Sequence, residues 1–321
     1  MDCFIIYNDF SRTENTVVFE QNITELFNKD YAEKRDNKMI YKTINPKFRN
    51  VILPLNLQII HSYVFNDCFE LMSIKIPDSV TNIGSNVFSN CTRLSSVKLP
   101  SKLTILNNNL FCNCTSLTSV DIPDGVTCID SNTFFNCTSL TNVKLKNKLE
   151  SINMTSFFNC KSLKSVEIPE SVTSIGVGAF ENCIQLSSVK LPSKLECLTY
   201  EIFRNCISLT SLTLPSELKN IDTNAVYGCG KLTEIDIPES ITNIGLGAFK
   251  NCTKLSDVTM KMNTLTIGDS VFENCNNIKN VDICGSKKDV TNVLNQMNLD
   301  KKNVKLKVTI VKLKFGLVIG I

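Results

Sequence analysis

Apolar and polar positions repeat along most of this chain with a period of 23 residues. Counted from a recurring phenylalanine, each unit has apolar residues at positions 1, 4, 7, 10, 12, 16 and 19. Position 1 is Phe in every unit but one, where Val226 replaces it, and position 4 is always Cys. This fixed period predicts a solenoid, because a short unit buries its apolar face only by stacking on its neighbours. The position-4 cysteines are Cys68, Cys91, Cys114, Cys137, Cys160, Cys183, Cys206, Cys229, Cys252 and Cys275.

The spacing within each unit predicts its local structure. Positions 10 and 12, as in Val97 and Leu99, alternate with polar residues, which is the pattern of a strand with one buried face. Proline at position 13 removes a backbone donor and ends that strand. Positions 23, 1 and 4, as in Ala179, Phe180 and Cys183, recur at helix-like intervals and predict one helical or 3-10 turn on the return side.

Position 20 predicts a tight corner in the backbone. It holds Gly, Asn, Asp or His in nine of the ten units, and Thr199 is the exception. These residue types are enriched at positive φ, so we expect the chain to turn sharply there. The one histidine, His61, occupies this position and so has a structural explanation.

The unit L-x-x-V-x-[IL]-P-x-x-[LV]-x-x-I followed by A-F-x-x-C, as in Ser174 to Leu191, resembles the 23-residue BspA-type, or Treponema-type, leucine-rich repeat. The resemblance implies a leucine-rich-repeat solenoid that is α/β and horseshoe-like, with a parallel β-sheet on one face and short turns on the return side. Such repeats are known across bacteria and protozoa, in binding and surface roles. Proline replaces the asparagine that usually follows the strand, while Asn90, Asn113 and Asn136 precede the cysteine, which puts an ordinary asparagine ladder in doubt.

The strand ends alternate between two types. Ile-Pro-[Asp/Glu] at 76, 122 and 168 alternates with Leu-Pro-Ser or Leu-Lys-Asn at 99, 145 and 191, which gives a super-period of 46 residues. The alternation breaks at Leu214 and resumes out of phase at Ile237. This break suggests that one unit was gained or lost late.

Three segments follow from the extent of the repeat. Residues 1–50 lack it and predict an N-terminal cap with one short helix, because Asn22-Ile-Thr-Glu25 resembles a capping box. Residues 51–283 form the solenoid of about ten units. Residues 284–321 predict a C-terminal cap, with a helix after Asp289 and then a basic edge strand in which apolar residues alternate from Val304 to Ile310.

Composition excludes several classes of protein. Apolar residues make up 43% and charged residues 20%, so the chain is neither disordered nor a series of membrane spans. The net charge of +3 is too small to indicate a nucleic-acid binder. The apolar end, Phe315 to Ile321, is far shorter than the roughly 20 residues that a transmembrane helix needs. Met1 to Phe10 has no basic region, so no secretory signal is expected.

No constellation for catalysis, metal or cofactor is expected. Equivalent side chains in a stack run parallel into the core, which favours buried free thiols over disulfides. No C-x-x-C or nearby His completes a metal site. Gly176-Val-Gly178 and Gly245-Leu-Gly247 resemble phosphate loops faintly and fit repeat corners better. The glycosylation sequons, such as Asn136-Cys-Thr, repeat beside the buried cysteine and are read as coincidence.

The outward strand positions, 9 and 11, form the candidate binding surface. Lysines favour its N-terminal half and acids its C-terminal end, so it could orient a dipolar partner; an ordinary solvated sheet face is the alternative. No aromatic stripe is present for stacked bases or sugars. The strands alone offer about 550 Å², below the roughly 800 Å² per partner of a standard interface, so a peptide-like segment is expected or added contacts at the loop rims and caps. The candidate residues are Lys75, Lys98, Lys144, Lys190, Glu234, Asp236, Asp257 and Asp282.

The sequence therefore predicts a non-enzymatic protein-binding scaffold without cofactors. The unpaired cysteines and the missing signal favour a cytoplasmic location. A cell-surface adhesin that reaches the surface by an unconventional route is the alternative that the resemblance implies. A weaker possibility is attachment to an anionic membrane surface through C-terminal lysines, although lysines on an edge strand commonly prevent aggregation. These lysines are Lys301, Lys302, Lys305, Lys307, Lys312 and Lys314.

Overall fold

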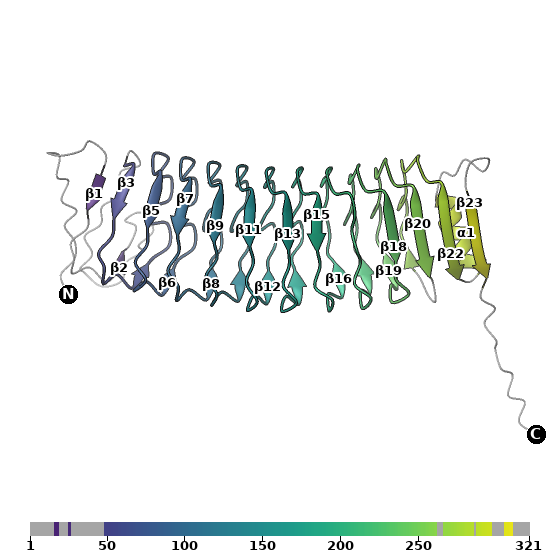
Figure 1. Ribbon diagram of the computed structural model, residues 1–321, viewed down its shortest axis with the longest axis horizontal. Coiled ribbons are helices and arrows are strands. Elements are labelled where there is room, and N and C mark those ends of the chain that lie inside the picture. The colour runs from purple at the N-terminus through teal and green to yellow at the C-terminus, as the bar shows by residue number, and fades with distance from the viewer. Residues whose placement is uncertain are drawn as a thin grey trace, which may run out of the picture.

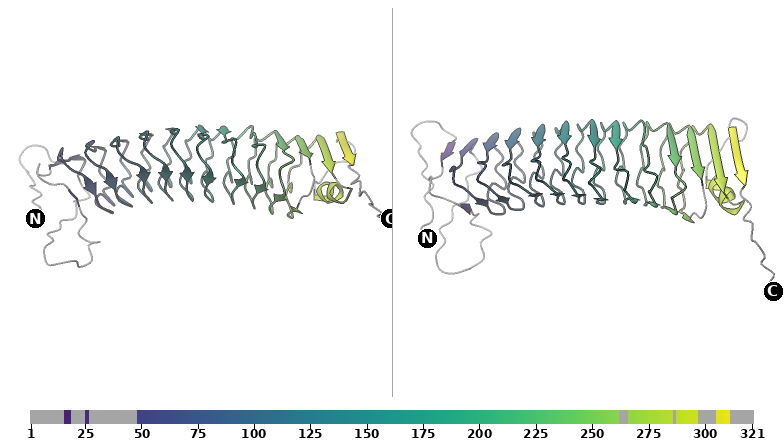
Figure 2. Two further views of the ribbon diagram at one scale, coloured as in Figure 1. Left: turned by 90° about the horizontal axis from the view of Figure 1, so that it is seen from below. Right: turned by 60° about the horizontal axis from the view of Figure 1, so that its bottom comes forward.

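The chain forms an elongated, gently curved stack of coils (Figures 1 and 2). The computed structural model describes residues 16–18, 25–26, 48–261, 266–285, 287–296 and 305–310. Each regular coil contributes two short strands, and strands of successive coils pair in parallel. Ser73 pairs with Ser96 and Asn82 lies opposite Ile59, so the register advances by one repeat per coil. The leucine-rich-repeat solenoid predicted from the sequence is thus confirmed.

Repeat positions 9 to 11 form the first strand row, in which the middle residue points inward and its neighbours point outward. The row consists of β1 (Thr16–Val18), β3 (Asn50–Ile52), β5 (Ser73–Lys75), β7 (Ser96–Lys98), β9 (Ser119–Asp121), β11 (Asn142–Lys144), β13 (Ser165–Glu167), β15 (Ser188–Lys190), β18 (Glu234–Ile237), β20 (Asp257–Lys261), β22 (Asn280–Gly285) and β23 (Lys305–Ile310).

Positions 18 and 19 form a second strand row that the sequence did not predict, because a two-residue strand is too short to show alternation. The row consists of β2 (Glu25–Leu26), β4 (Ile59–Ile60), β6 (Asn82–Ile83), β8 (Ile105–Leu106), β10 (Cys128–Ile129), β12 (Ser151–Ile152), β14 (Ser174–Ile175), β16 (Cys197–Leu198), β17 (Asn220–Ile221), β19 (Asn243–Ile244) and β21 (Thr266–Ile267).

The core is built from columns of identical side chains. Phenylalanine rings stack at centroid distances of 5.2 to 5.8 Å from Phe65 to Phe203, and Phe249 stacks on Phe272 at 5.5 Å. Beside this column, the thiols from Cys91 to Cys275 each donate to the carbonyl oxygen of the position-1 residue one coil earlier, as from Cys137 Sγ to Phe111 O at 3.1 Å. All cysteines of the described residues are free. The expectation of buried, unbridged thiols in the column is therefore confirmed.

The return side consists of hydrogen-bonded turns, which corrects the expected helical or 3-10 turn. Alternate backbone N–H groups there donate to the next coil, as from Phe111 N to Thr133 O at 2.8 Å. The N–H groups between them form single bonds within the turn, as from Cys112 N to Asn109 O at 3.2 Å, so no continuous helix forms. Positive φ also recurs at positions 22 and 3, as at Asn132 (57°) and Asn136 (58°), which stops helical propagation. The one helix of the described residues is α1 (Lys287–Gln296).

The corner predicted at position 20 is also corrected. Its glycines have negative φ, and they are small because the previous coil lies too close for a side chain. A Cβ on Gly176 would lie 2.3 Å from the backbone nitrogen of Met154. The positive-φ corners lie two residues later, where Gly178 and Gly247 each have φ of 60°. Close approach and positive φ select the same small residues, so composition alone did not separate them.

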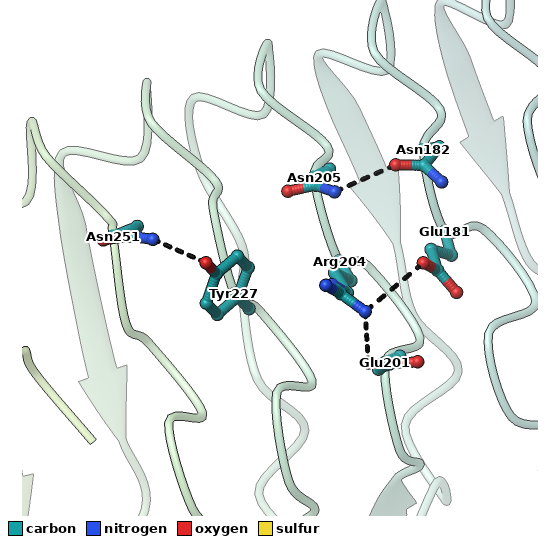
Figure 3. Close-up of polar contacts among 7 residues, drawn as sticks. All are labelled: Glu181, Asn182, Glu201, Arg204, Asn205, Tyr227 and Asn251. Carbon is teal, nitrogen blue, oxygen red and sulfur yellow. Dashed lines mark hydrogen bonds and ion pairs between the residues drawn. The ribbon is translucent and has the colours of Figure 1, made fainter. Parts of the chain in front are cut away.

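An asparagine ladder runs along the turns at position 3, and not after the strand, where proline replaces the usual asparagine. Asn136 donates through Nδ2 to Asn113 Oδ1 at 3.0 Å and accepts from Asn159 Nδ2 at 2.6 Å. Figure 3 shows a later rung, in which Asn205 donates to Asn182 Oδ1 at 2.9 Å. The ladder engages the amides of sequons such as Asn136-Cys137-Thr138, so glycosylation there would break it.

We expect Asn136→Ala to lower the free energy of unfolding by about 2 to 3 kcal/mol, because it removes two partly buried hydrogen bonds and places alanine at positive φ. Asn136→Gly removes the same bonds without the backbone strain, so its loss should be smaller by about 1 kcal/mol. Urea titration of both variants measures the difference. Equal losses for Ala and Gly would show that the backbone is not strained at this turn.

The phenylalanine stack and the asparagine ladder are both interrupted in the coil of Val226 and Gly228. Val226 breaks the phenylalanine stack, and Gly228 has no side-chain amide to continue the ladder. Tyr227 takes the place of the missing asparagine in the ladder, since its hydroxyl accepts from Asn251 Nδ2 at 2.8 Å. The guanidinium of Arg204 lies over the Tyr227 ring at 5.3 Å and pairs with Glu201 at 2.6 Å (Figure 3). This coil follows the break in the 46-residue alternation.

The alternating strand ends are explained by contacts between paired coils. The Asp78 carboxylate accepts from the backbone N–H of Ser101 at 3.2 Å. Four coils later, Glu170 accepts from both the backbone N–H and the hydroxyl of Ser193 at 2.8 Å. An acidic residue in one coil therefore caps the serine of the next.

The N-terminal end of the stack differs from the cap that the sequence predicts. Glu25 and Leu26, which lie in the expected N-terminal helix, form β2 and pair with Ile59 and Ile60, so the helix is wrong at these residues. Backbone pairing with an existing strand row outweighs the capping-box signal there. The rest of that helix lies outside the described residues.

At the C-terminal end, α1 lies beside β22, and Val293 is buried against the core (Figure 1). The strand β23 pairs in parallel with β22. No helix in the described part of the chain has the length and hydrophobicity of a membrane span.

Candidate partner-binding face

The outward side chains of the first strand row form the outer strand face, where all eight residues predicted as a binding site are found. Alternation places positions 9 and 11 on this face, while position 10 enters the core. Lys75 lies directly opposite Lys98 in the register, and Lys144 lies opposite Asp121. The solenoid therefore brings residues far apart in sequence onto neighbouring strands.

Three of the predicted lysines keep their charge unpaired. Among the described residues, Lys75, Lys98 and Lys144 form no ion pair. Asp121 lies between them and pairs instead with Lys146, at 3.4 Å. Like charges on adjacent strands repel, so this half of the face attracts an anionic group.

The fourth lysine and two of the acids are occupied within the protein. Lys190 pairs with Glu167 at 2.7 Å, which raises the pKa of the lysine. Asp282 pairs with Lys307, also at 2.7 Å. The pKa of Asp257 is lowered by a hydrogen bond from Ser256 and, to a smaller extent, by one from Asn280. These charges are already compensated, which makes them weaker candidates for partner contacts.

Two acids stay free at the C-terminal end. Glu234 and Asp236 on β18 are exposed and form no ion pair with any described residue. Their neighbours in the register are Asp257 and Thr259, which supply no positive charge. The unpaired charge of the face is therefore positive over β5 to β11 and negative at β18.

A hollow of about 690 Å³ opens on the face between β11 and β13. The first strand row is interrupted at this point, because β11 pairs only with β9, and β13 only with β15. The hollow was not predicted, since the repeat positions around it are regular. The lining includes Asn142, Lys144, Ser165, Glu167, Glu170 and Lys190.

Burial raises the pKa of eight of the ten thiols in the cysteine column. Burial raises the pKa of Cys183 and of Cys229 to about 12. The partly exposed Cys197 has its pKa raised to about 12 by desolvation and by Asp222. Nucleophilic attack needs a thiolate, so these cysteines are poor nucleophiles near neutral pH. In the described part of the chain, no group of His, Cys, Asp and Glu is placed to hold a metal ion.

The C-terminal lysines proposed for membrane attachment are only partly described. Lys305 is exposed on β23, whereas Lys307 is engaged with Asp282. Lys301, Lys302, Lys312 and Lys314 lie outside the described residues. Membrane attachment thus stays a prediction.

Comparison with known proteins agrees with the geometry. The family described as "BspA type Leucine rich repeat region (6 copies)" matches residues 58–187, 105–229 and 173–300. The chain is similar to a leucine-rich repeat protein from Bacteroides ovatus, with 24% identity, a TM-score of 0.62 and coverage of 93% of this chain and 84% of that chain. It is also similar to the pneumococcal vaccine antigen PcpA, with 18% identity, a TM-score of 0.57 and coverage of 96% and 82%. No curated protein matches.

Proposed function

Because this chain belongs to the BspA-type leucine-rich repeat family, we propose that it is a non-enzymatic scaffold that binds a protein or peptide partner through the outer strand face. The observation that carries the proposal is the separation of unpaired charge along that face. Lys75, Lys98 and Lys144 are free at one end, and Glu234 and Asp236 are free at the other. Complementary charge on a partner would set its orientation and speed its association.

The test is affinity capture with the full chain and two charge-reversed variants. Lys75→Glu/Lys98→Glu/Lys144→Glu changes the free lysines of the face. The control, Lys102→Glu/Lys148→Glu/Lys194→Glu, makes the same charge change at exposed position 15 of three coils. We expect a partner retained by the native chain and the control to be lost by the first variant. Equal retention by all three chains would contradict binding through this face.

For location, we propose the cytoplasm, where reducing conditions keep thiols unpaired. The free cysteines of the described residues support this. Cell-surface recognition is the second candidate, and it is favoured by the similarity in fold to PcpA, which is described as a vaccine antigen. Labelling intact cells with a membrane-impermeant reagent separates the two, because only a surface protein would be tagged.

A further inference from the structure

We propose that the face from β5 to β13 binds an extended acidic peptide segment, with one of its carboxylates held in the hollow between β11 and β13. This inference rests on the proposed function and names the chemistry of the partner. Three features of the molecule support it: an interruption of the sheet, the free charge beside that interruption, and the spacing of the free lysines.

The interruption is local to the outer strand face. In the coils before and after, the backbone N–H at position 8 donates to the coil before it, as from Thr141 to Thr118 O at 3.0 Å and from Ser187 to Lys164 O at 2.9 Å. The corresponding bond from Lys164 to Thr141 does not form. The second strand row stays paired there, with Ser151 opposite Ser174. The coils thus spread only on this face, which opens the hollow.

The hollow is lined by two lysines and two glutamates, and an anion is favoured on its Lys144 side. Glu167 is occupied by Lys190, at 2.7 Å. Glu170 accepts two hydrogen bonds from Ser193, each of 2.8 Å. Glu170 keeps its negative charge under these neutral donors, but Lys144 is the lining lysine that has no ion-pair partner among the described residues. A carboxylate from outside would supply that partner.

The lysines are spaced for an extended chain. Lys75, Lys98 and Lys144 lie on β5, β7 and β11, which span three strand spacings of about 4.8 Å, or about 14 Å. An extended peptide rises about 3.3 Å per residue, so about five residues cover this distance. Asp121 stands in the row between Lys98 and Lys144, where it is paired with Lys146. Beside the row, position 9 carries exposed Ser73, Ser96 and Ser119, whose small side chains offer hydroxyl donors.

A fluorescein-labelled hexaglutamate peptide tests the inference by anisotropy with the full chain. We expect it to bind, and hexaglutamine to bind at least about tenfold more weakly. The variant Lys75→Glu/Lys98→Glu/Lys144→Glu should lose about tenfold or more of the hexaglutamate affinity, and the variant at Lys102, Lys148 and Lys194 should lose little. The milder variant Lys144→Gln removes one positive charge without adding a negative one, and it should show an intermediate loss of hexaglutamate affinity.

The hollow itself is tested with two tryptophan variants. Ser165 lines the hollow, whereas Ser188 is exposed at the same repeat position outside the lining. Ser165→Trp should fill the hollow and weaken hexaglutamate binding, while Ser188→Trp should leave it close to native. Circular dichroism of each variant confirms that the coils are intact before binding is compared.

Several results would overturn the inference. Equal binding of hexaglutamine, or equal losses in both triple-lysine variants, would show that peptide acidity or this face is irrelevant. Equal competition by a single-stranded oligonucleotide would indicate a general polyanion surface. If affinity capture still depends on the face while hexaglutamate does not bind, the proposed function stands and only the acidic-peptide inference fails. If neither depends on the face, both fail.

Discussion

Raising the pH from about 8 to about 10 should unfold this protein. Burial raises the pKa of eight thiols in the cysteine column, and it holds Cys183 and Cys229 at about 12. In the unfolded chain each thiol titrates near its usual value of about 8.5. Above that pH the unfolded state loses protons that the folded state retains, so stability falls as the pH rises.

The size of this effect follows from the number of thiols. Each one costs about 1.4 kcal/mol per pH unit above its unfolded pKa and below its folded pKa. Eight together cost roughly 11 kcal/mol over one unit, which is comparable to the whole stability of a typical folded protein, about 5 to 15 kcal/mol. Other proteins also weaken in alkali, but this dependence is unusually steep because the same buried group recurs in every coil.

Circular dichroism and ultraviolet absorbance of the thiolate, recorded together under reducing conditions, measure the transition. We expect ordered structure to be lost as thiolate forms, and to return when the pH is lowered. The double variant Cys160→Ala/Cys183→Ala serves as the matched comparison. It should be less stable at pH 7 and show a shallower decline of stability with pH, by two thiols. An unchanged slope would mean that the column does not couple to folding.

The second large effect is expected in the phenylalanine column. Phe157 is fully buried and stacks on Phe134 and Phe180 at 5.2 Å each. Phe157→Ala should lower the free energy of unfolding by about 3 to 5 kcal/mol, because it leaves a cavity in the middle of a continuous stack. Interior lesions in a repeat protein also weaken the interfaces on both sides.

Phe158→Ala is the matched control, one residue further along. Phe158 is only half-buried and stacks on Phe135 at 4.7 Å, on the outside of the same turn. Its loss should be about 1 kcal/mol. Urea titration compares the two. Similar losses for both variants would contradict the assignment of Phe157 to a closed core and Phe158 to its surface.

Periodicity predicted the fold well because the same burial pattern recurs in every coil. Alternation around Val97 gave the first strand row, and the invariant cysteine gave the core column. The return turns were harder to predict from the sequence. Glycine is required at Gly176 because the previous coil lies close, and at Gly178 because φ is positive, so the same residue type has two different causes. Hydrogen bonds along Asn113 and Asn136 were also missed, although their spacing of one repeat makes such contacts predictable.

At the candidate site, too, the sequence predicted some features and missed others. Sequence position placed all eight charged residues on one face, but it did not distinguish free from compensated charge. Glu167 and Lys190 are one repeat apart, so a stacked register brings them into contact, and this pair could have been found from spacing. The hollow could not, because it depends on a missing backbone hydrogen bond at Lys164 in a coil whose sequence is regular.

Alkylation of the native protein without reductant tests the stacked architecture most directly. At about pH 8, iodoacetamide followed by peptide mass spectrometry should leave the column cysteines from Cys68 to Cys252 unmodified in the folded chain. After unfolding in urea, still without reductant, all of them should be alkylated, because they are buried and not bridged. Modification in the folded state, or resistance in urea that only a reductant relieves, would contradict the column and, with it, the face that the column positions.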